Sequence, residues 1–202
     1  MAREHSEAAE TTRCLDEALA ETFPASDPPA MTSPSAATPS SDVVVEAAHG
    51  PLRVYRVIEA GQAAEPFAPT TAGGRWSPPG HACVYVSLSP AGALLEYLAH
   101  RSDGDGDAGD GLLLATAELP PGTSLSECNE PSTWRHLPYR PDVQQVGAAW
   151  LASGRSLALR VPSALVHGED NMLLSPTHPA FAALQVRALA PLQVDPRLRS
   201  AR

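Results

Sequence analysis

The chain has 202 residues and a net charge of −9, and its 14 basic residues are all arginine because the sequence contains no lysine. The absence of lysine excludes Schiff-base catalysis and the phosphate-binding lysine of P-loop proteins. The acidic balance argues against direct binding of nucleic acid, which needs clustered positive charge. Three cysteines are too few for a disulfide framework, and no apolar run approaches the roughly 18 residues of a membrane span. We therefore expect a soluble protein of the reducing cytoplasm with no membrane partner.

Most of the negative charge lies in the first 50 residues, which hold nine acidic residues against Arg3 and Arg13. Residues 12–22 have the spacing of a short helix, which would be either transient or a docking peptide. Residues 23–42 hold five prolines among serine, alanine and threonine, a composition that buries too little apolar surface to fold. We expect residues 1–50 to form a flexible, disordered arm and linker, and residues 51–202 to form one folded domain.

From residue 52 onward, short apolar segments alternate with turn-forming residues. Period-2 patterning and β-branched residues predict strands, at 52–58, 81–88, 112–119 and 155–163. Two helices are predicted between them. The first spans 89–101, with Ser89 as its N-cap and Pro90 in its first turn, and the second spans 141–154, with Asp142 as its cap and Gly154 as its stop. This mixture without regular β-α-β alternation is typical of an α+β or irregular α/β domain.

Metal and nucleotide motifs are absent from the sequence. The seven histidines are isolated, and no Cys-x-x-Cys pair or His-Glu-x-x-His motif occurs. Residues 103–111 place aspartates at alternate positions, but Ala108 and Leu114 stand where a calcium loop needs glycine and a bidentate glutamate. A solvated hairpin loop explains this segment better, and we expect no metal site.

Five polar residues stand out in otherwise apolar segments: Arg56, Arg75, Tyr85, Glu96 and Ser163. Arginine forks match a pyrophosphate, an aromatic face takes a heterocyclic ring, and a lone carboxylate stabilises a sugar cation. Each residue also has a structural interpretation, since a buried arginine commonly pairs with a carboxylate, a tyrosine packs in the core and a serine closes a turn. From these residues alone, the sequence predicts an α+β domain that binds a phosphorylated ligand.

Several segments that contain these residues also resemble a known family. They are VYRV (54–57), GGRWSPPG (73–80), VYVSLSPAGALLEYLAH (84–100), QQVGAAWLASGRSLALRVPSALV (144–166) and EDNMLLSPTHPAF (169–181). Their order and content resemble the RES-domain proteins, the toxins of bacterial type II toxin–antitoxin pairs with Xre-type antitoxins. The resemblance covers residues 52–197 and leaves the N-terminal arm unaccounted for.

The resemblance implies a fold related to ADP-ribosyltransferases, with a mixed, split β-sheet flanked by helices, and an activity on NAD as substrate with no further cofactor. It implies that Arg56 and Arg75 bind the pyrophosphate or ribose side of NAD, and that Tyr85 packs against nicotinamide. Glu96 would stabilise the ribosyl cation or orient the attacking group at the ribose, and Ser163 would position the same end of NAD. The resemblance thus implies Glu96, Arg75 and Ser163 as the catalytic residues. Gln144 and Asn171 are further candidates for binding NAD. A cognate Xre-type antitoxin is the implied partner, and an oligomer could arise through that complex.

The sequence departs from the family pattern at three positions. Ser77 and Ser175 stand where the family generally has asparagine, and Ala148 replaces a frequent acidic residue, although both serines can still form hydrogen bonds. Three functions stay open: a glycohydrolase or phosphorylase that depletes NAD and arrests growth, a protein ADP-ribosyltransferase that uses the same site, and an inactive interaction module. The sequence favours the first.

Overall fold

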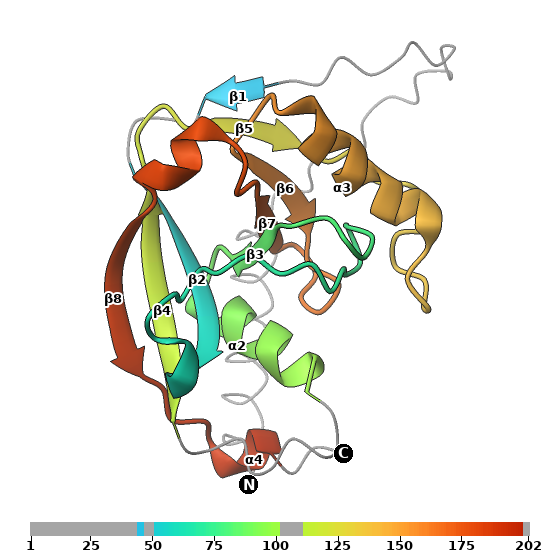
Figure 1. The fold of residues 1–202 in the computed structure, drawn as a ribbon. Helices are drawn as coiled ribbons and strands as arrows, with labels where there is room; N and C mark the ends of the chain where they lie inside the picture. The colour runs from blue at the N-terminus through green and yellow to red at the C-terminus, as the bar shows by residue number, and fades with distance from the viewer. Residues whose placement is uncertain (1–43, 47–50, 102–110, 200–202) are drawn as a thin grey trace, which may run out of the picture. The chain divides into compact units, whose positions relative to one another are not determined.

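The computed structural model describes residues 44–46, 51–101 and 111–199. Within these residues, the strands form one eight-stranded sheet in the order β1-β5-β6-β7-β3-β2-β4-β8 (Figure 1). The strands are β1 (Val44–Glu46), β2 (Leu52–Glu59), β3 (Val84–Ser87), β4 (Leu112–Leu119), β5 (Ser124–Glu127), β6 (Ala158–Pro162), β7 (Asp170–Leu174) and β8 (Gln185–Pro191). The helices are η1 (Ala60–Gln62), α2 (Pro90–Ala99), α3 (Pro141–Ser153), η2 (Pro179–Ala183) and α4 (Pro196–Arg199).

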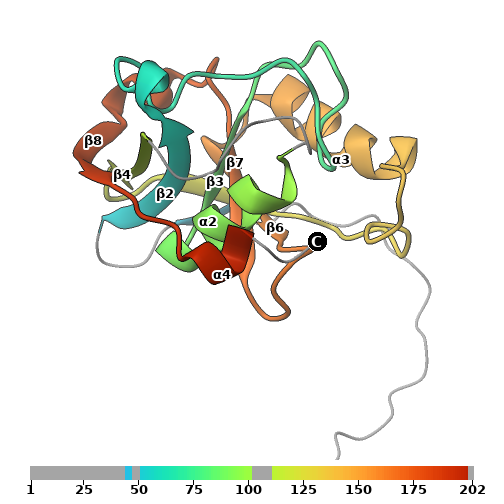
Figure 2. The same ribbon diagram turned by 90° about the horizontal axis from the view of Figure 1, so that it is seen from below.

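The sheet divides between β2 and β3. In the described chain these strands share the single register pair Tyr55 and Ser87, whereas β2 pairs with β4 along its whole length. Strands β5 and β6 are parallel, and the other neighbouring strands are antiparallel. Helix α2 packs against both β2 and β3, and Figures 1 and 2 show it lying over the place where they part. The expected α+β fold with a split, mixed sheet is confirmed.

Core residues pack on both faces of the inner strands, whereas the edge strand β8 is exposed. On β3, Val84 and Val86 point into the largest core cluster. Cys83 and the partly buried Tyr85 point to the opposite face, into a cluster that includes Val143 and Trp150 of α3. On β2 and α2, Val57 and Ala93 belong to a third cluster. Helices α2 and α3 therefore cover the face that carries Tyr85.

The N-cap of α2 was predicted correctly and that of α3 was not. Ser89 Oγ accepts the amide of Gly92 at 2.9 Å, with Pro90 in the first turn. The N-cap residue of α3 is instead Arg140, whose side chain forms no capping hydrogen bond, and Asp142 lies in the first turn of the helix. The Asp142 carboxylate accepts the hydroxyl of Thr133, while Pro141, whose missing N–H costs nothing in a first turn, begins the helix.

The predicted strands at 52–58 and 112–119 match β2 and β4, and the other two match the shorter β3 and β6. Strands β5, β7 and β8 were missed. So was β1, which lies within the segment assigned to the linker and pairs with β5. The expected helix at 12–22 and most of the aspartate-rich loop at 103–111 lie outside the described residues. No helix in the described ranges has both the length and the apolar content that a bilayer crossing demands.

Candidate active site

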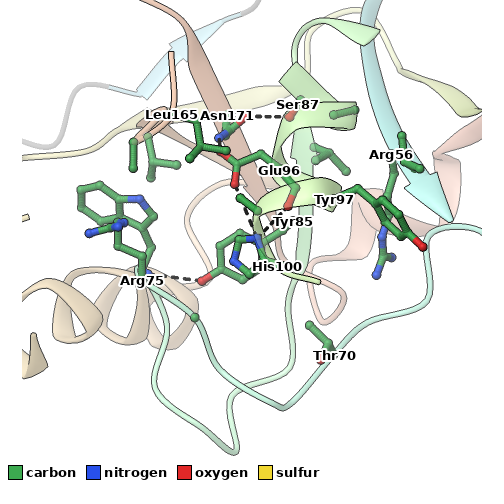
Figure 3. Close-up of a pocket in the computed structure, with 18 of the residues that line it drawn as sticks. Arg56, Thr70, Arg75, Tyr85, Ser87, Glu96, Tyr97, His100, Leu165 and Asn171 are labelled. Atoms are coloured by element: carbon green, nitrogen blue, oxygen red, sulfur yellow. Dashed lines mark hydrogen bonds and ion pairs between the residues drawn. The ribbon is translucent and has the colours of Figure 1, made fainter. Parts of the chain in front are cut away.

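A pocket of about 440 Å³ lies where β2 and β3 separate. Such a volume is typical of small-molecule sites. Five of the seven predicted site residues line it: Arg56, Arg75, Tyr85, Glu96 and Asn171. Ser163 and Gln144 are not among its lining residues, although each bonds to a group that is. Figure 3 shows Arg56 and Arg75 on either side of Glu96.

Glu96 lies in the second half of α2, and its carboxylate is held from β7 and from the segment after β6. Asn171 Nδ2 donates to Glu96 Oε1 at 2.7 Å, and Ser163 Oγ lies 3.5 Å from the same oxygen. The other oxygen, Oε2, is 3.8 Å from His100 Nδ1, and the Glu96 side chain is 28% exposed. The carboxylate is therefore held by hydrogen bonds at Oε1, and the Glu96 side chain lines the pocket.

Arg75 lies in the turn between η1 and β3. Its Nη1 donates to the carbonyl of Trp134 at 2.6 Å and more weakly to that of His136 at 3.3 Å, and its guanidinium lies 5.0 Å from the centre of the Tyr139 ring. Among the described residues, the hydrogen bonds of the Arg75 guanidinium come from Nη1 alone. Gln144, on α3, donates to the carbonyl of Gly74 at 2.9 Å, so it anchors the turn that carries Arg75.

Arg56 points from β2 into the other side of the pocket. Its Nη1 donates to the carbonyl of Ala68 at 2.9 Å and to that of Pro66 at 3.4 Å. Burial lowers the pKa of Arg56 below its ordinary value, yet a guanidinium stays charged at every physiological pH. Across the described part of the chain, no carboxylate forms an ion pair with Arg56 or Arg75. Two cations without anionic partners therefore flank Glu96, as an anionic ligand requires.

Tyr85 forms part of the wall between these arginines. Its hydroxyl is 2.9 Å from Ser77 Oγ and accepts the Trp76 amide at 3.3 Å. Burial raises the pKa of Tyr85 well above its ordinary value, so the hydroxyl stays neutral and its ring is available as an apolar surface. A β-carbon on Gly74 would stand 2.8 Å from this hydroxyl, which explains why the turn needs glycine there.

Ser77 and Ser175, the two serines that the sequence resemblance marked as departures, are buried and lie within hydrogen-bond distance of other hydroxyl groups. Ser77 is 0% exposed and contacts Tyr85. Ser175 is 1% exposed, and its hydroxyl lies 3.2 Å from that of Thr177. Both positions thus keep a polar contact with a shorter side chain.

Sequence reasoning missed several residues that line the pocket. Tyr139 precedes α3, Tyr97 follows Glu96 on α2, His100 is the C-cap of that helix, and Tyr55 lies beside Arg56 on β2. For Tyr97 and Tyr55, adjacency to a predicted residue was the available signal. The sequence carries no signal for Tyr139, because the packing of α3 is what brings the loop before this helix to the pocket.

Several known proteins resemble this chain in sequence or in fold. The model of the RES domain matches residues 53–195. A protein named Toxin Res from Yersinia enterocolitica serotype O:8 / biotype 1B is 36% identical over 135 residues, which cover 66% of this chain and 88% of that protein. The Prs ADP-ribosylating toxin of Sphingobium sp. strain YBL2 is 31% identical over 135 residues, which cover 62% of this chain and 80% of that one.

Among solved structures, the crystal structure of the M. tuberculosis MbcT–MbcA toxin–antitoxin complex contains a chain with a similar fold. The TM-score is 0.52 over 77% of this chain and 89% of that chain, at 18% sequence identity. The match of the domain model over most of the chain, together with a relative of 36% identity, identifies this chain as a member of the RES-domain family.

Proposed function

We propose that this chain is the toxin of a toxin–antitoxin pair and that it cleaves NAD at the bond between nicotinamide and ribose, so that it depletes NAD and arrests growth. The observation that carries the proposal is the Glu96 carboxylate, fixed through Oε1 by Asn171 at 2.7 Å. It lies in a pocket with Arg56 and Arg75, which form no ion pair with a carboxylate of the described residues. A pyrophosphate matches the arginines, and a ribosyl cation matches the carboxylate.

The chemistry needs little beyond these groups. The C–N glycosidic bond breaks with both electrons leaving on nicotinamide, which departs as a neutral molecule. The ribose carries the positive charge as an oxocarbenium ion, which Glu96 stabilises. Water or phosphate then adds to the cation and gives up a proton. Arg56 and Arg75 hold the diphosphate, and the ring of Tyr85 packs against nicotinamide.

The decisive test is release of nicotinamide from NAD by purified protein, with and without phosphate. We expect release by the wild type and a loss of at least about 100-fold in Glu96→Gln, as for other groups that stabilise charge in the transition state. Glu130→Gln, at an exposed carboxylate outside the pocket lining, is the matched control. Equal turnover by folded Glu96→Gln and wild type would overturn the role of Glu96.

A second function is favoured by one observation, the 31% identity to a protein named Prs ADP-ribosylating toxin. With a protein nucleophile in place of water, the same cation would yield an ADP-ribosylated target. Labelled ADP-ribose appearing on a protein of the host cell would support this transferase. Absence of both release and transfer would favour the inactive interaction module.

The partner of this chain would be a cognate Xre-type antitoxin, a proposal supported by the fold shared with a chain of the MbcT–MbcA toxin–antitoxin complex. We expect the cognate protein to bind over the pocket and suppress nicotinamide release. Co-purification of the two proteins with unchanged turnover would contradict this arrangement.

A further inference from the structure

Two side-chain contacts join the end of β3 to the start of β7, next to Glu96. Ser87 Oγ donates to Asn171 Oδ1 at 2.7 Å, and these two residues form a register pair of the sheet. The second contact lies two residues after Ser87 and two residues before Asn171, where Ser89 Oγ donates to Glu169 Oε2 at 2.9 Å. Because Ser89 is also the N-cap of α2, both contacts lie where the helix that carries Glu96 begins.

The chemistry of the groups fixes the direction of the Ser87–Asn171 hydrogen bond. An ionised carboxylate only accepts hydrogen bonds, so Asn171 must turn its NH₂ group to Glu96 and its carbonyl to Ser87. The Ser87 hydroxyl must then donate. Ser87 is 3% exposed, so water cannot readily replace it. Among the described residues, no other side chain donates to Asn171 Oδ1.

The same contacts distinguish the two oxygens of Glu96. Oε1 faces Asn171 and Ser163, and the Ser163 hydroxyl in turn accepts the amides of Leu165 and Val166 at 3.2 and 3.1 Å. Accepting two amides leaves the Ser163 proton free to point toward Glu96. Oε2 lies 3.8 Å from His100 Nδ1, beyond hydrogen-bond distance. The side-chain hydrogen bonds that Glu96 accepts from the described residues reach Oε1, so Oε2 is the oxygen left for a substrate.

We propose that Ser87 is a positioning residue: it fixes the amide of Asn171, and Asn171 then holds Glu96 by Oε1 so that Oε2 faces the bound substrate. Ser87 also lines the pocket, but its proposed role is exerted through its hydrogen bond to Asn171. This inference rests on the proposed NAD cleavage. The sequence predicts that Asn171 binds NAD, whereas in this proposal Asn171 connects Ser87 to the Glu96 carboxylate.

A double-mutant cycle tests the link. We expect Ser87→Ala to lower kcat about ten-fold, the effect of one lost hydrogen bond in the transition state, with the KM for NAD changed less than about two-fold. In an Asn171→Ala background, Ser87→Ala should change kcat less than about two-fold, because the amide through which Ser87 acts on Glu96 is already absent. The control is Ser126→Ala, which removes a buried serine–serine contact of 2.8 Å to Ser156 away from the pocket and should leave kcat unchanged. Additive effects of Ser87→Ala and Asn171→Ala would overturn the proposal.

A second measurement does not depend on turnover. The side-chain NH₂ resonances of Asn171, identified by their loss in Asn171→Ala, should move in Ser87→Ala and in Glu96→Gln but not in Ser126→Ala. Ser87→Cys, which keeps the volume but weakens the donor, serves if Ser87→Ala unfolds. Moving resonances in a protein that releases no nicotinamide would refute the NAD cleavage and sustain the Ser87–Asn171–Glu96 link. If the Asn171 resonances do not move in Ser87→Ala while the wild type releases nicotinamide, the Ser87–Asn171–Glu96 link is refuted and the NAD cleavage stands.

Discussion

The carbonyl oxygen of Trp76 lies so close to Gly147 that a β-carbon on this glycine would stand 1.8 Å from it. Gly147 is in the middle of α3, and Trp76 follows Arg75 in the turn that borders the pocket. The helix backbone therefore rests directly on the backbone of the turn. Close packing of this kind sets where Arg75 can lie, and it ties the geometry of the pocket to the placement of α3.

We expect Gly147→Ala to lower the free energy of unfolding by about 3 kcal/mol, because a methyl group at this position forces the helix and the turn apart. Turnover should fall together with stability, since the turn carries Arg75. Thermal and urea unfolding measure the loss. Ala149→Gln, at an exposed site on the same helix, is the control and should unfold like the wild type. A Gly147→Ala protein with unchanged stability would contradict the close approach.

Gln144 should affect NAD binding through the turn and not by direct contact, because its Nε2 donates to the carbonyl of Gly74 at 2.9 Å. We expect Gln144→Leu to raise the KM for NAD about five-fold, the effect of one hydrogen bond, with a small change in kcat. Gln145→Leu changes the neighbouring exposed glutamine of α3 and should leave both constants unchanged. Equal effects of the two variants would mean that Gln144 does not anchor the turn.

Arg56→Lys should separate binding from stability. A lysine can still donate to the carbonyl of Ala68, which Arg56 Nη1 reaches at 2.9 Å, so the melting temperature should change little. It cannot offer a planar fork to a diphosphate, and we expect binding of ADP-ribose, measured by calorimetry, to weaken at least about ten-fold. Arg53→Lys, on the same strand but outside the pocket lining, should bind ADP-ribose normally. Wild-type affinity in Arg56→Lys would remove Arg56 from the binding site.

Glu118 should govern part of the stability of the protein in acid. Its carboxylate accepts Arg53 Nε at 3.0 Å and Arg187 Nε at 2.7 Å, so it joins β2, β4 and β8, and these arginines lower the pKa of Glu118. The unfolded chain binds this proton at a higher pH, near 4.3. The stabilisation is therefore complete above that pH and is lost as the pH falls through the lowered pKa of the folded state.

We expect Glu118→Gln to melt at a lower temperature than the wild type at pH 7, and the difference to shrink as the pH falls below about 4. Melting curves across this range measure the difference. Glu130→Gln, which removes an exposed carboxylate, should show no such pH-dependent difference. A difference in melting temperature between wild type and Glu118→Gln that stays the same at all pH values would show that the ion pairs of Glu118 do not cause it.

Local signals were enough to predict some elements. Ser89 and Pro90 gave the start of α2 because a cap acts on the amides of its own first turn. Strands β2 and β4 were identified from their period-2 patterning and their β-branched and aliphatic residues, which depend only on neighbours along the chain. Strand β8 was missed because all of its residues are exposed, so it lacks the alternation of a half-buried strand. Asp142 has a side chain typical of a cap, but α3 begins one residue earlier, at Pro141, and the Asp142 carboxylate accepts the hydroxyl of Thr133.

Within the candidate site, the sequence identified the chemical groups, and the tertiary structure decided how they act. The sequence singled out polar and aromatic residues in apolar segments, because burying a polar group there is costly unless it has a partner or a ligand. Four of them line one pocket: Arg56, Arg75, Tyr85 and Glu96. Ser87 gave no signal, because a serine in a strand becomes informative only when its partner on β7 is known.

The sequence by itself determined the family, the apolar strands and the residue types that suit an anionic, ribose-containing substrate, because these depend on composition and on neighbours along the chain. The tertiary structure alone decided that Asn171 and Ser163 hold one oxygen of Glu96, that Gln144 anchors the turn before Arg75, and that Tyr139 borders the pocket. Those relationships join residues far apart in the chain, and they exist because the sheet opens between β2 and β3 while α2 and α3 pack on the same face.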